Sequence, residues 1–398
     1  MFEKMVLRRG EDGGGATLGE IAEGLLFYQR VHLILDRPVV INLVEKIGMN
    51  QLLALLNRPG VSAVYCREML GTMTQQVGAL THHSFVGMEL TGQTPKPDRV
   101  QTPLDVVHQI LKANNNYSGR QARKLAETFF EKVPIRSLMS KDFLIQGKGL
   151  ADAATDDVYD LNFLHEAFSR TLQASEGFAG FKTRLSLEVQ PTELGFTVFS
   201  NLDLAETNLI RSRRVPALGE LTPAYLLNEI LMARSDLMLA SHYGSDFKTS
   251  NVGSEILDLR YGELMKRSGV HETQLNEFQT VVVNQGRSLK EVIDCGERSF
   301  AEFLALLDKA TLFKNWSSGV HPDSSMVAEY LKEAAGQGWI GSLPAKVLRF
   351  VIGGVIDAKL PGASKAFGVA DAFLIDKFMK GWRPNHFVEN RLKPFVNS

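Results

Sequence analysis

The chain has 398 residues, a mass of 44.1 kDa and a net charge of -1, with 44 Lys plus Arg against 45 Asp plus Glu. Apolar residues make up 44% and charged residues 22%, so the composition excludes a disordered chain. The near-neutral balance excludes a bulk polycation built for nucleic acid or anionic membrane. The two cysteines, Cys66 and Cys295, exclude a disulfide framework and a Cys-based zinc site.

The N-terminal part of the chain is expected to be α/β. Its lead-in ends in Gly13–Gly15 and is taken as a flexible segment. Thr17 and Glu20 then have the spacing of a capping box, which predicts the start of a helix. Val31–Leu35 and Val61–Tyr65 have the pattern of buried strands, with a helical pattern between them. Alternation of strands and helices is typical of α/β units.

The middle of the chain mixes helices with a β-hairpin. Two helices are predicted over residues 104–113 and 120–132, after a Pro-rich connection. The clearest β signal covers residues 181–200, where apolar and polar residues alternate on both sides of a turn at Pro191–Gly195. This pattern predicts an antiparallel hairpin with one apolar and one polar face.

The C-terminal part is helical in pattern from Leu221 onward. Thr222 and Pro223 predict an N-cap followed by proline in the first turn. Ser299 and Glu302 form a second capping box ahead of an apolar run. No strand is expected in this part.

The expected fold class is therefore α+β, with a mixed N-terminal half and a mainly α-helical C-terminal domain. Three regions are expected: an α/β unit over residues 1–100, a mixed region with the hairpin over 101–215, and a helical domain over 216–398.

Carboxylates are the candidate metal ligands that remain. Asp36 ends the first predicted strand, and Asp157 and Asp160 belong to an acidic cluster at a helix start. Such acids could bind Mg²⁺ for phosphodiester cleavage, which makes a metal-dependent nuclease one hypothesis. Acids in a first helical turn also interact favourably with the positive end of the helix dipole without binding metal, and that interpretation is favoured. The favoured expectation is therefore no cofactor, with Mg²⁺ as the alternative and the identity of any metal unknown.

Basic residues are concentrated locally rather than over the whole chain. Arg211, Arg213 and Arg214 follow the predicted hairpin and are candidate ligands for nucleic acid or another anion. An ordinary solvated face is the competing interpretation, since the chain has no charge excess.

Membrane insertion is not expected. The N-terminus lacks the apolar core of a secretory signal, which predicts a cytoplasmic protein with reduced thiols. Small residues recur every four positions within 343–378, as in closely packed helices, but charged residues interrupt the segment. Soluble close packing or self-association is favoured there, and a membrane-disrupting effector acting through 343–378 stays an alternative.

A resemblance adds a setting to these patterns. The block Ser299–Trp316, continuing to Trp339–Arg349, resembles a region of uncharacterised bacterial proteins, and the whole chain resembles proteins found among bacterial phage-defence genes. The resemblance covers the C-terminal quarter and carries no catalytic motif, so it transfers no site residue. It implies a bacterial multi-protein defence system as the context.

The leading hypothesis is a non-enzymatic binding or assembly component of such a system, with a protein partner or a second copy of the chain as its ligand. Nucleic acid binding through the local basic patches remains open. The alternatives are the nuclease and the membrane-disrupting effector described above.

Overall fold

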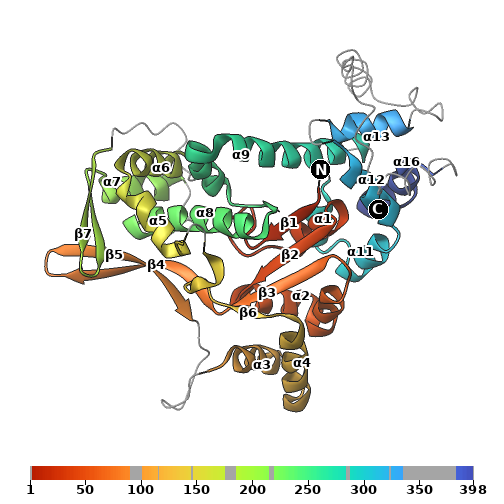
Figure 1. Cartoon of the computed structure of the whole chain (residues 1–398), viewed down its shortest axis with the longest axis horizontal. Helices are drawn as coiled ribbons and strands as arrows, with labels where there is room; N and C mark the ends of the chain where they lie inside the picture. The colour runs from red at the N-terminus through yellow and green to blue at the C-terminus, as the bar shows by residue number, and fades with distance from the viewer. Residues whose placement is uncertain are drawn as a thin grey trace. The chain divides into compact units, whose positions relative to one another are not determined.

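The computed structural model describes residues 2–89, 101–114, 116–144, 147–174, 185–214, 219–283, 287–321, 324–334 and 382–397. Helices and two sheets, one with parallel pairing and one antiparallel, make up this part of the chain (Figure 1). The expected α+β class is confirmed. Segment 343–378 lies outside the described residues.

The chain folds into two compact units, each assembled from segments that are distant in sequence. The first unit holds Met1–Met5, Thr17–Val31 and Arg267–Ser398, and the second holds Val6–Ala16 and His32–Lys266. The three consecutive regions expected from the sequence divide the chain differently and stay a prediction. The two units are described separately below.

A five-stranded sheet has the strand order β6-β3-β2-β1-β9. Its strands are β1 (Lys4–Leu7), β2 (Arg30–Leu35), β3 (Val61–Cys66), β6 (Ile135–Arg136) and β9 (Asp246–Phe247). The predicted strands at β2 and β3 are confirmed, and all residues of β2 after Arg30 are buried, as expected for a strand covered on both faces.

Two expectations about this sheet were wrong. The lead-in that ends in Gly13–Gly15 is expected to be flexible, whereas Met5, Val6 and Leu7 are buried in β1. A four-residue strand is too short to show an alternation of apolar and polar residues, so β1 could not be recognised from the sequence pattern. The C-terminal part was expected to lack strands, yet Asp246 and Phe247 form β9 at the sheet edge.

Helix α2 (Arg37–Leu56) follows β2 directly and breaks at Gly48. Gly48 has φ of 73°, a left-handed conformation that glycine adopts without the clash a Cβ would cause. The break releases the N–H of Met49 from the helix, and this N–H donates to the hydroxyl of Tyr117 at 2.8 Å. By length and composition α2 could cross a membrane, a weak criterion that core helices also meet.

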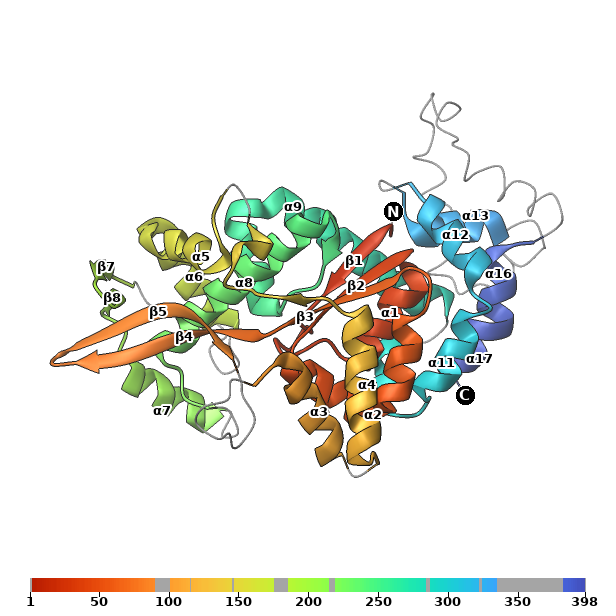
Figure 2. The ribbon, with the colours of Figure 1, turned by 60° about the horizontal axis from the view of Figure 1, so that its bottom comes forward.

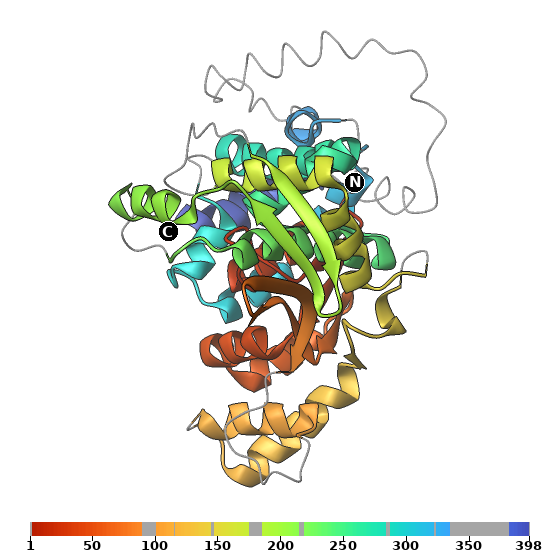
Figure 3. The ribbon, with the colours of Figure 1, turned by 90° about the vertical axis from the view of Figure 1, so that its left-hand side faces the viewer.

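Helices α3 (Pro103–Ala113) and α4 (Gly119–Lys132) confirm the two predicted middle helices and lie side by side (Figure 3). Both start with a capping box, Thr102 with Asp105 and Ser118 with Gln121. Both helices contact α2, and the loop between them carries Tyr117. The hydroxyl of that tyrosine therefore connects the α3–α4 loop to the break in α2.

A four-stranded antiparallel sheet has the order β4-β5-β8-β7. Strands β7 (Leu187–Thr192) and β8 (Gly195–Ser200) are the hairpin predicted over 181–200, where residues from 185 on are described (Figure 3). Strands β4 (Glu68–Val77) and β5 (Leu80–Glu89) form a longer hairpin that reaches outward as a two-stranded ribbon (Figure 2). The sequence reasoning did not predict this second hairpin.

The helical core of the second unit is built around α8 (Pro223–Tyr243). Thr222 caps it as predicted, and it is buried on nearly all sides because α5, α6 and β4 contact it. The other helices here are α5 (Leu150–Tyr159), α6 (Leu161–Ala174), α7 (Leu204–Arg214) and the start of α9 (Asn251–Glu277).

In the first unit α1 (Leu18–Phe27) is buried along its entire length and contacts three later helices. Its N-terminus is held by Asp294, which accepts from the Thr17 hydroxyl at 2.7 Å and from the Gly19 N–H at 2.9 Å. Besides the end of α9, the other described α-helices of this unit are α10 (Leu289–Asp294), α11 (Phe300–Leu307), α12 (Thr311–Gly319), α13 (Met326–Ala334), α16 (Pro384–Phe387) and α17 (Lys393–Asn397).

Candidate functional site

Asp36, the first candidate metal ligand, caps helix α2. Its Oδ1 accepts a hydrogen bond from the N–H of Val39 at 3.0 Å. Burial raises the pKa of Asp36, while this hydrogen bond and the positive charge of Arg8 oppose the rise. Capping the N-terminus of α2 therefore explains why an aspartate stands at this position.

Asp157 and Asp160 are engaged by arginines. Asp157 is buried on α5, and its two carboxylate oxygens accept hydrogen bonds from Nε and Nη2 of Arg234, at 2.7 Å each. Arg260 adds a contact of 2.6 Å to Asp157 and also binds Asp160. Asp160 in turn caps α6 through the N–H of Phe163. Burial raises the pKa of Asp157, and the two guanidinium groups oppose that rise.

These acids do not form a metal site together. Across the part of the chain that the structure describes, no group of three or more His, Cys, Asp or Glu side chains is placed so that it could hold a metal ion. Asp157 already accepts three contacts from two guanidinium groups, so a divalent cation would compete with both for the same carboxylate. The Mg²⁺ alternative stays a prediction without a described ligand set.

The arginine cluster does not present three guanidinium groups together. Arg211 is 8% exposed and donates from Nη1 to the carbonyl of Gly219, whereas Arg213 is exposed. Arg214 is the last residue of α7. The side chain of Arg211 is thus engaged by Gly219, and an anion-binding role for the cluster stays a prediction.

The outer face of the β4–β5 hairpin carries exposed apolar side chains. Pairing places Val77 opposite Leu80 and Met69 opposite Met88, and residues two apart on a strand share a face. Met73 is 39%, Val77 53% and Leu80 42% exposed, all on this face. The opposite face holds Leu70 and Phe85 in the core. We call the first set the outer face of the hairpin.

Strand β4 is also an outer strand of its sheet, so one of its backbone edges is not paired by the described strands. From Met69 to Met88 the sequence has no Asp, Glu, Lys or Arg and no proline. The other outer strand, β7, carries Glu188 and Pro191. The outer strands of the five-stranded sheet, β6 and β9, are two residues long each. Charge, proline and shortness are the usual features that protect an edge strand, and β4 has neither a charge nor a proline after its first residue, Glu68, over nine further residues.

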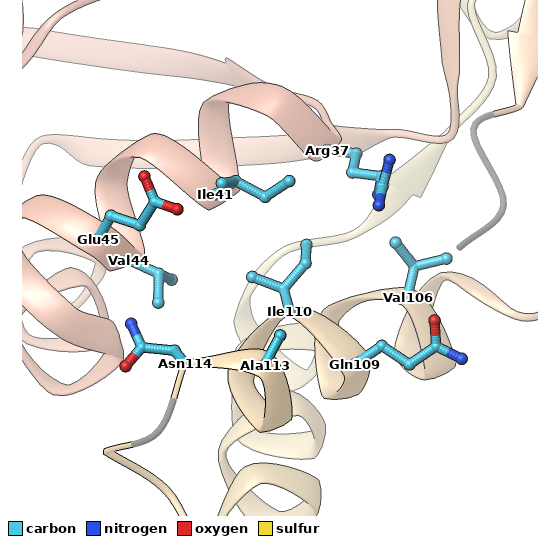
Figure 4. A pocket seen from close by; sticks show the side chains of 9 residues that line it. All are labelled: Arg37, Ile41, Val44, Glu45, Val106, Gln109, Ile110, Ala113 and Asn114. Atoms are coloured by element: carbon cyan, nitrogen blue, oxygen red, sulfur yellow. The ribbon is translucent and has the colours of Figure 1, made fainter. Parts of the chain in front are cut away.

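A cavity of about 560 Å³ lies between α2 and α3, within the size range of small-molecule sites, roughly 300–1,000 Å³ (Figure 4). It is lined by Arg37, Ile41, Val44, Glu45, Val106, Gln109, Ile110, Ala113 and Asn114. Figure 4 shows Arg37 and Glu45 toward opposite ends, with the aliphatic side chains between them. The Nε of Arg37 is buried and has no hydrogen-bond partner among the described residues.

Neither the outer face of the hairpin nor the cavity was found by sequence reasoning. A signal for the hairpin was present, because twenty consecutive residues without a charge surround Gly78, a turn residue with φ of 61°. The cavity left a weaker signal. Val106, Ile110 and Ala113 have helical spacing, but a buried helix face gives the same pattern.

Comparisons of the chain with protein-family models, with curated proteins and with solved structures find no match. What the chain does must therefore be inferred from its own residues.

Proposed function

We propose that this chain acts by binding, as an assembly component of a bacterial multi-protein system of the phage-defence type. The observation that supports the proposal is the unprotected edge of β4 beside the apolar outer face of the same hairpin. An unpaired edge offers main-chain donors and acceptors, which give affinity in strand addition. The first occupant is a second copy of the chain.

A second copy fits this edge by charge. Two β4 strands that pair antiparallel about a two-fold axis place Met69–Val77 of one copy against the same residues of the other. A strand with charges of one sign would oppose itself in this geometry, but these nine residues carry none. The neutral edge is therefore compatible with pairing to itself.

The geometry of such a pair also uses the apolar residues. Antiparallel edge pairing makes one continuous eight-stranded sheet from two four-stranded sheets, with both outer faces on the same side. Met73 and Val77 of each copy then gain apolar neighbours across the axis. The enlarged outer face would be the surface that a further protein of the system contacts.

The candidate acids support binding over catalysis. Asp157 is held by Arg234 and Arg260, and Asp36 caps α2. Each of these two acids has a structural partner that explains its position without a metal.

The test is the oligomeric state in solution, measured by size-exclusion chromatography with light scattering. We expect a species of about twice the 44.1 kDa chain mass. Gln75→Lys places a charge on the exposed part of β4 and should weaken self-association by about tenfold or more. Gln190→Lys is the matched control, because it makes the same change at an exposed position of β7.

Three outcomes contradict the proposal. A strict monomer at all concentrations, with no complex formed by the products of neighbouring genes, would remove assembly through β4. A dimer equally insensitive to Gln75→Lys and Gln190→Lys would place the interface elsewhere. Mg²⁺-dependent cleavage of DNA or RNA that is lost in Asp36→Ala would favour the nuclease instead.

A further inference from the structure

The cavity between α2 and α3 has the chemistry of a small-molecule site, independently of the hairpin. Its two helices belong to the same compact unit, so its shape does not depend on the arrangement of the units. Helix α2 supplies Arg37, Ile41, Val44 and Glu45, two turns apart from first to last, and α3 supplies the facing wall.

Arg37 provides the strongest evidence for a ligand at this site. Its side chain is the positive charge among the residues that line the cavity, and a guanidinium group has five N–H donors. Figure 4 shows the guanidinium group on the α3 side, above Val106 and Gln109. A carboxylate or phosphate oxygen would satisfy such a donor by a charge-assisted hydrogen bond.

The middle of the cavity is apolar. Ile41 and Val44 from α2 face Ile110 and Val106 from α3, so an alkyl or aromatic body would be removed from water here (Figure 4). At the end opposite Arg37, Glu45 is exposed, and its negative charge disfavours a second anionic group on the ligand. Cation, apolar body and carboxylate thus follow one another along the cavity.

We propose that this cavity binds a small amphipathic molecule with a single anionic group, held at Arg37, and an apolar body between Ile41 and Ile110. Glu45 acts as the specificity residue that discriminates against a dianion. The proposal does not rest on the proposed function, and a monomeric protein could carry the same site.

The probe is octanoate, which combines one carboxylate with a short apolar chain. Binding is followed by the methyl NMR signals of the full chain labelled at isoleucine. We expect saturable shifts at Ile41 and Ile110, with Ile230 and Ile256 in the α8–α9 core as unshifted references. Octanol is the neutral match in length and should bind more weakly.

Variants separate the contributions of the two ends. Arg37→Gln should raise the dissociation constant for octanoate by about tenfold or more and leave octanol unchanged. Lys112→Gln is the matched control, since it removes one positive charge from an exposed site on α3 that does not line the cavity. Octanedioate should bind more weakly than octanoate, and Glu45→Gln should reduce that difference.

The proposal is overturned if octanoate causes no saturable shift at Ile41 or Ile110. It is also overturned if Arg37→Gln and Lys112→Gln bind octanoate equally. Equal affinity for octanoate and octanedioate removes the role of Glu45. Because Arg37→Gln could disturb the start of α2, octanol binding to that variant serves as the measure that the cavity is intact.

Discussion

At the residue scale the buried acids of the second unit are organised by arginines. Asp157 lies between Arg234 and Arg260, and Asp236 accepts from Arg8 at 3.1 Å and from Thr249 at 2.9 Å. Removing one member of a buried ion pair leaves the other charge buried and unpaired, so breaking one of these sets destabilises the fold far more than breaking a surface pair does.

Asp157→Ala should therefore lower the free energy of unfolding by about 3–5 kcal/mol, measured by urea denaturation. Asp156→Ala is the control at the neighbouring position of α5, because Asp156 is exposed and pairs with Lys148 at the surface. We expect a change of about 0–1 kcal/mol there. Equal effects of the two substitutions would show that the arginine cluster does not stabilise the fold.

Glu229 gives a prediction for pH. Burial raises its pKa, against the positive charge of Arg9 and with the negative charge of Asp236 adding to the rise. Because the folded-state pKa lies above the unfolded one, the protonated form favours folding. Its contribution is complete below the unfolded pKa and is lost as pH rises through the folded pKa.

Glu229→Gln should therefore melt at a higher temperature than the wild type near pH 7.5, and this difference should shrink as the pH falls toward about 4. Thermal unfolding followed by circular dichroism across this range measures it. Glu220→Gln, at an exposed position, should show no such dependence. A difference that grows toward acidic pH would reverse the sign of the argument.

Sequence patterns predicted contacts within one helical turn and missed contacts between residues that are far apart in the chain. The capping boxes of Thr17 with Glu20 and Ser299 with Glu302 are confirmed, since both partners lie within one helical turn. The partners Asp157 and Arg234 are 77 positions apart, and nothing in either local sequence indicates the other. Acids that seemed free in sequence are therefore paired in space.

At the element scale the break in α2 depends on Gly48 and Tyr117. A Cβ at Gly48 would lie 3.2 Å from the Tyr117 hydroxyl, and the positive φ is unfavourable for any other residue. The break allows α2 to keep contact with both α3 and α4 while the hydroxyl satisfies the released N–H of Met49.

Gly48→Ala should lower the free energy of unfolding by about 1–3 kcal/mol, from the left-handed backbone and the crowded hydroxyl. Gly119→Ala is the control, because a Cβ there meets no atom within 4 Å and its φ is not positive. It should be neutral or slightly stabilising, by up to about 1 kcal/mol. Urea denaturation of both variants makes the comparison, and equal losses would contradict the role assigned to the break.

Elements with a strong period were predictable, and elements defined by pairing were not. The period of α3 and the alternation of β7 and β8 identified these elements correctly. Strands β4 and β5 lack that signal, because their outer face keeps Met73, Val77 and Leu80 exposed. With apolar residues on both faces the alternation disappears, which is the reason that the longest hairpin was overlooked.

At the scale of the whole molecule the outer strands of the described sheets are not equivalent. Shortness protects β6 and β9, and Glu188 and Pro191 protect β7. Sequence reasoning could establish the α+β class, because composition and period report it directly. It could not place β4 at an edge, because strand order is set by pairing between distant segments.

The discontinuous composition of the two units bears on how the chain can fold during synthesis. Asp294, which holds the start of α1, is made 277 residues after Thr17. At about 5–20 residues per second, α1 must wait between about 14 and 55 seconds for the helix that covers it. Every residue of α1 is buried in the finished molecule, and the helices α10, α11 and α12 that contact it are all absent throughout that interval. We therefore expect a chaperone to bind the nascent chain at α1 until these helices have been made.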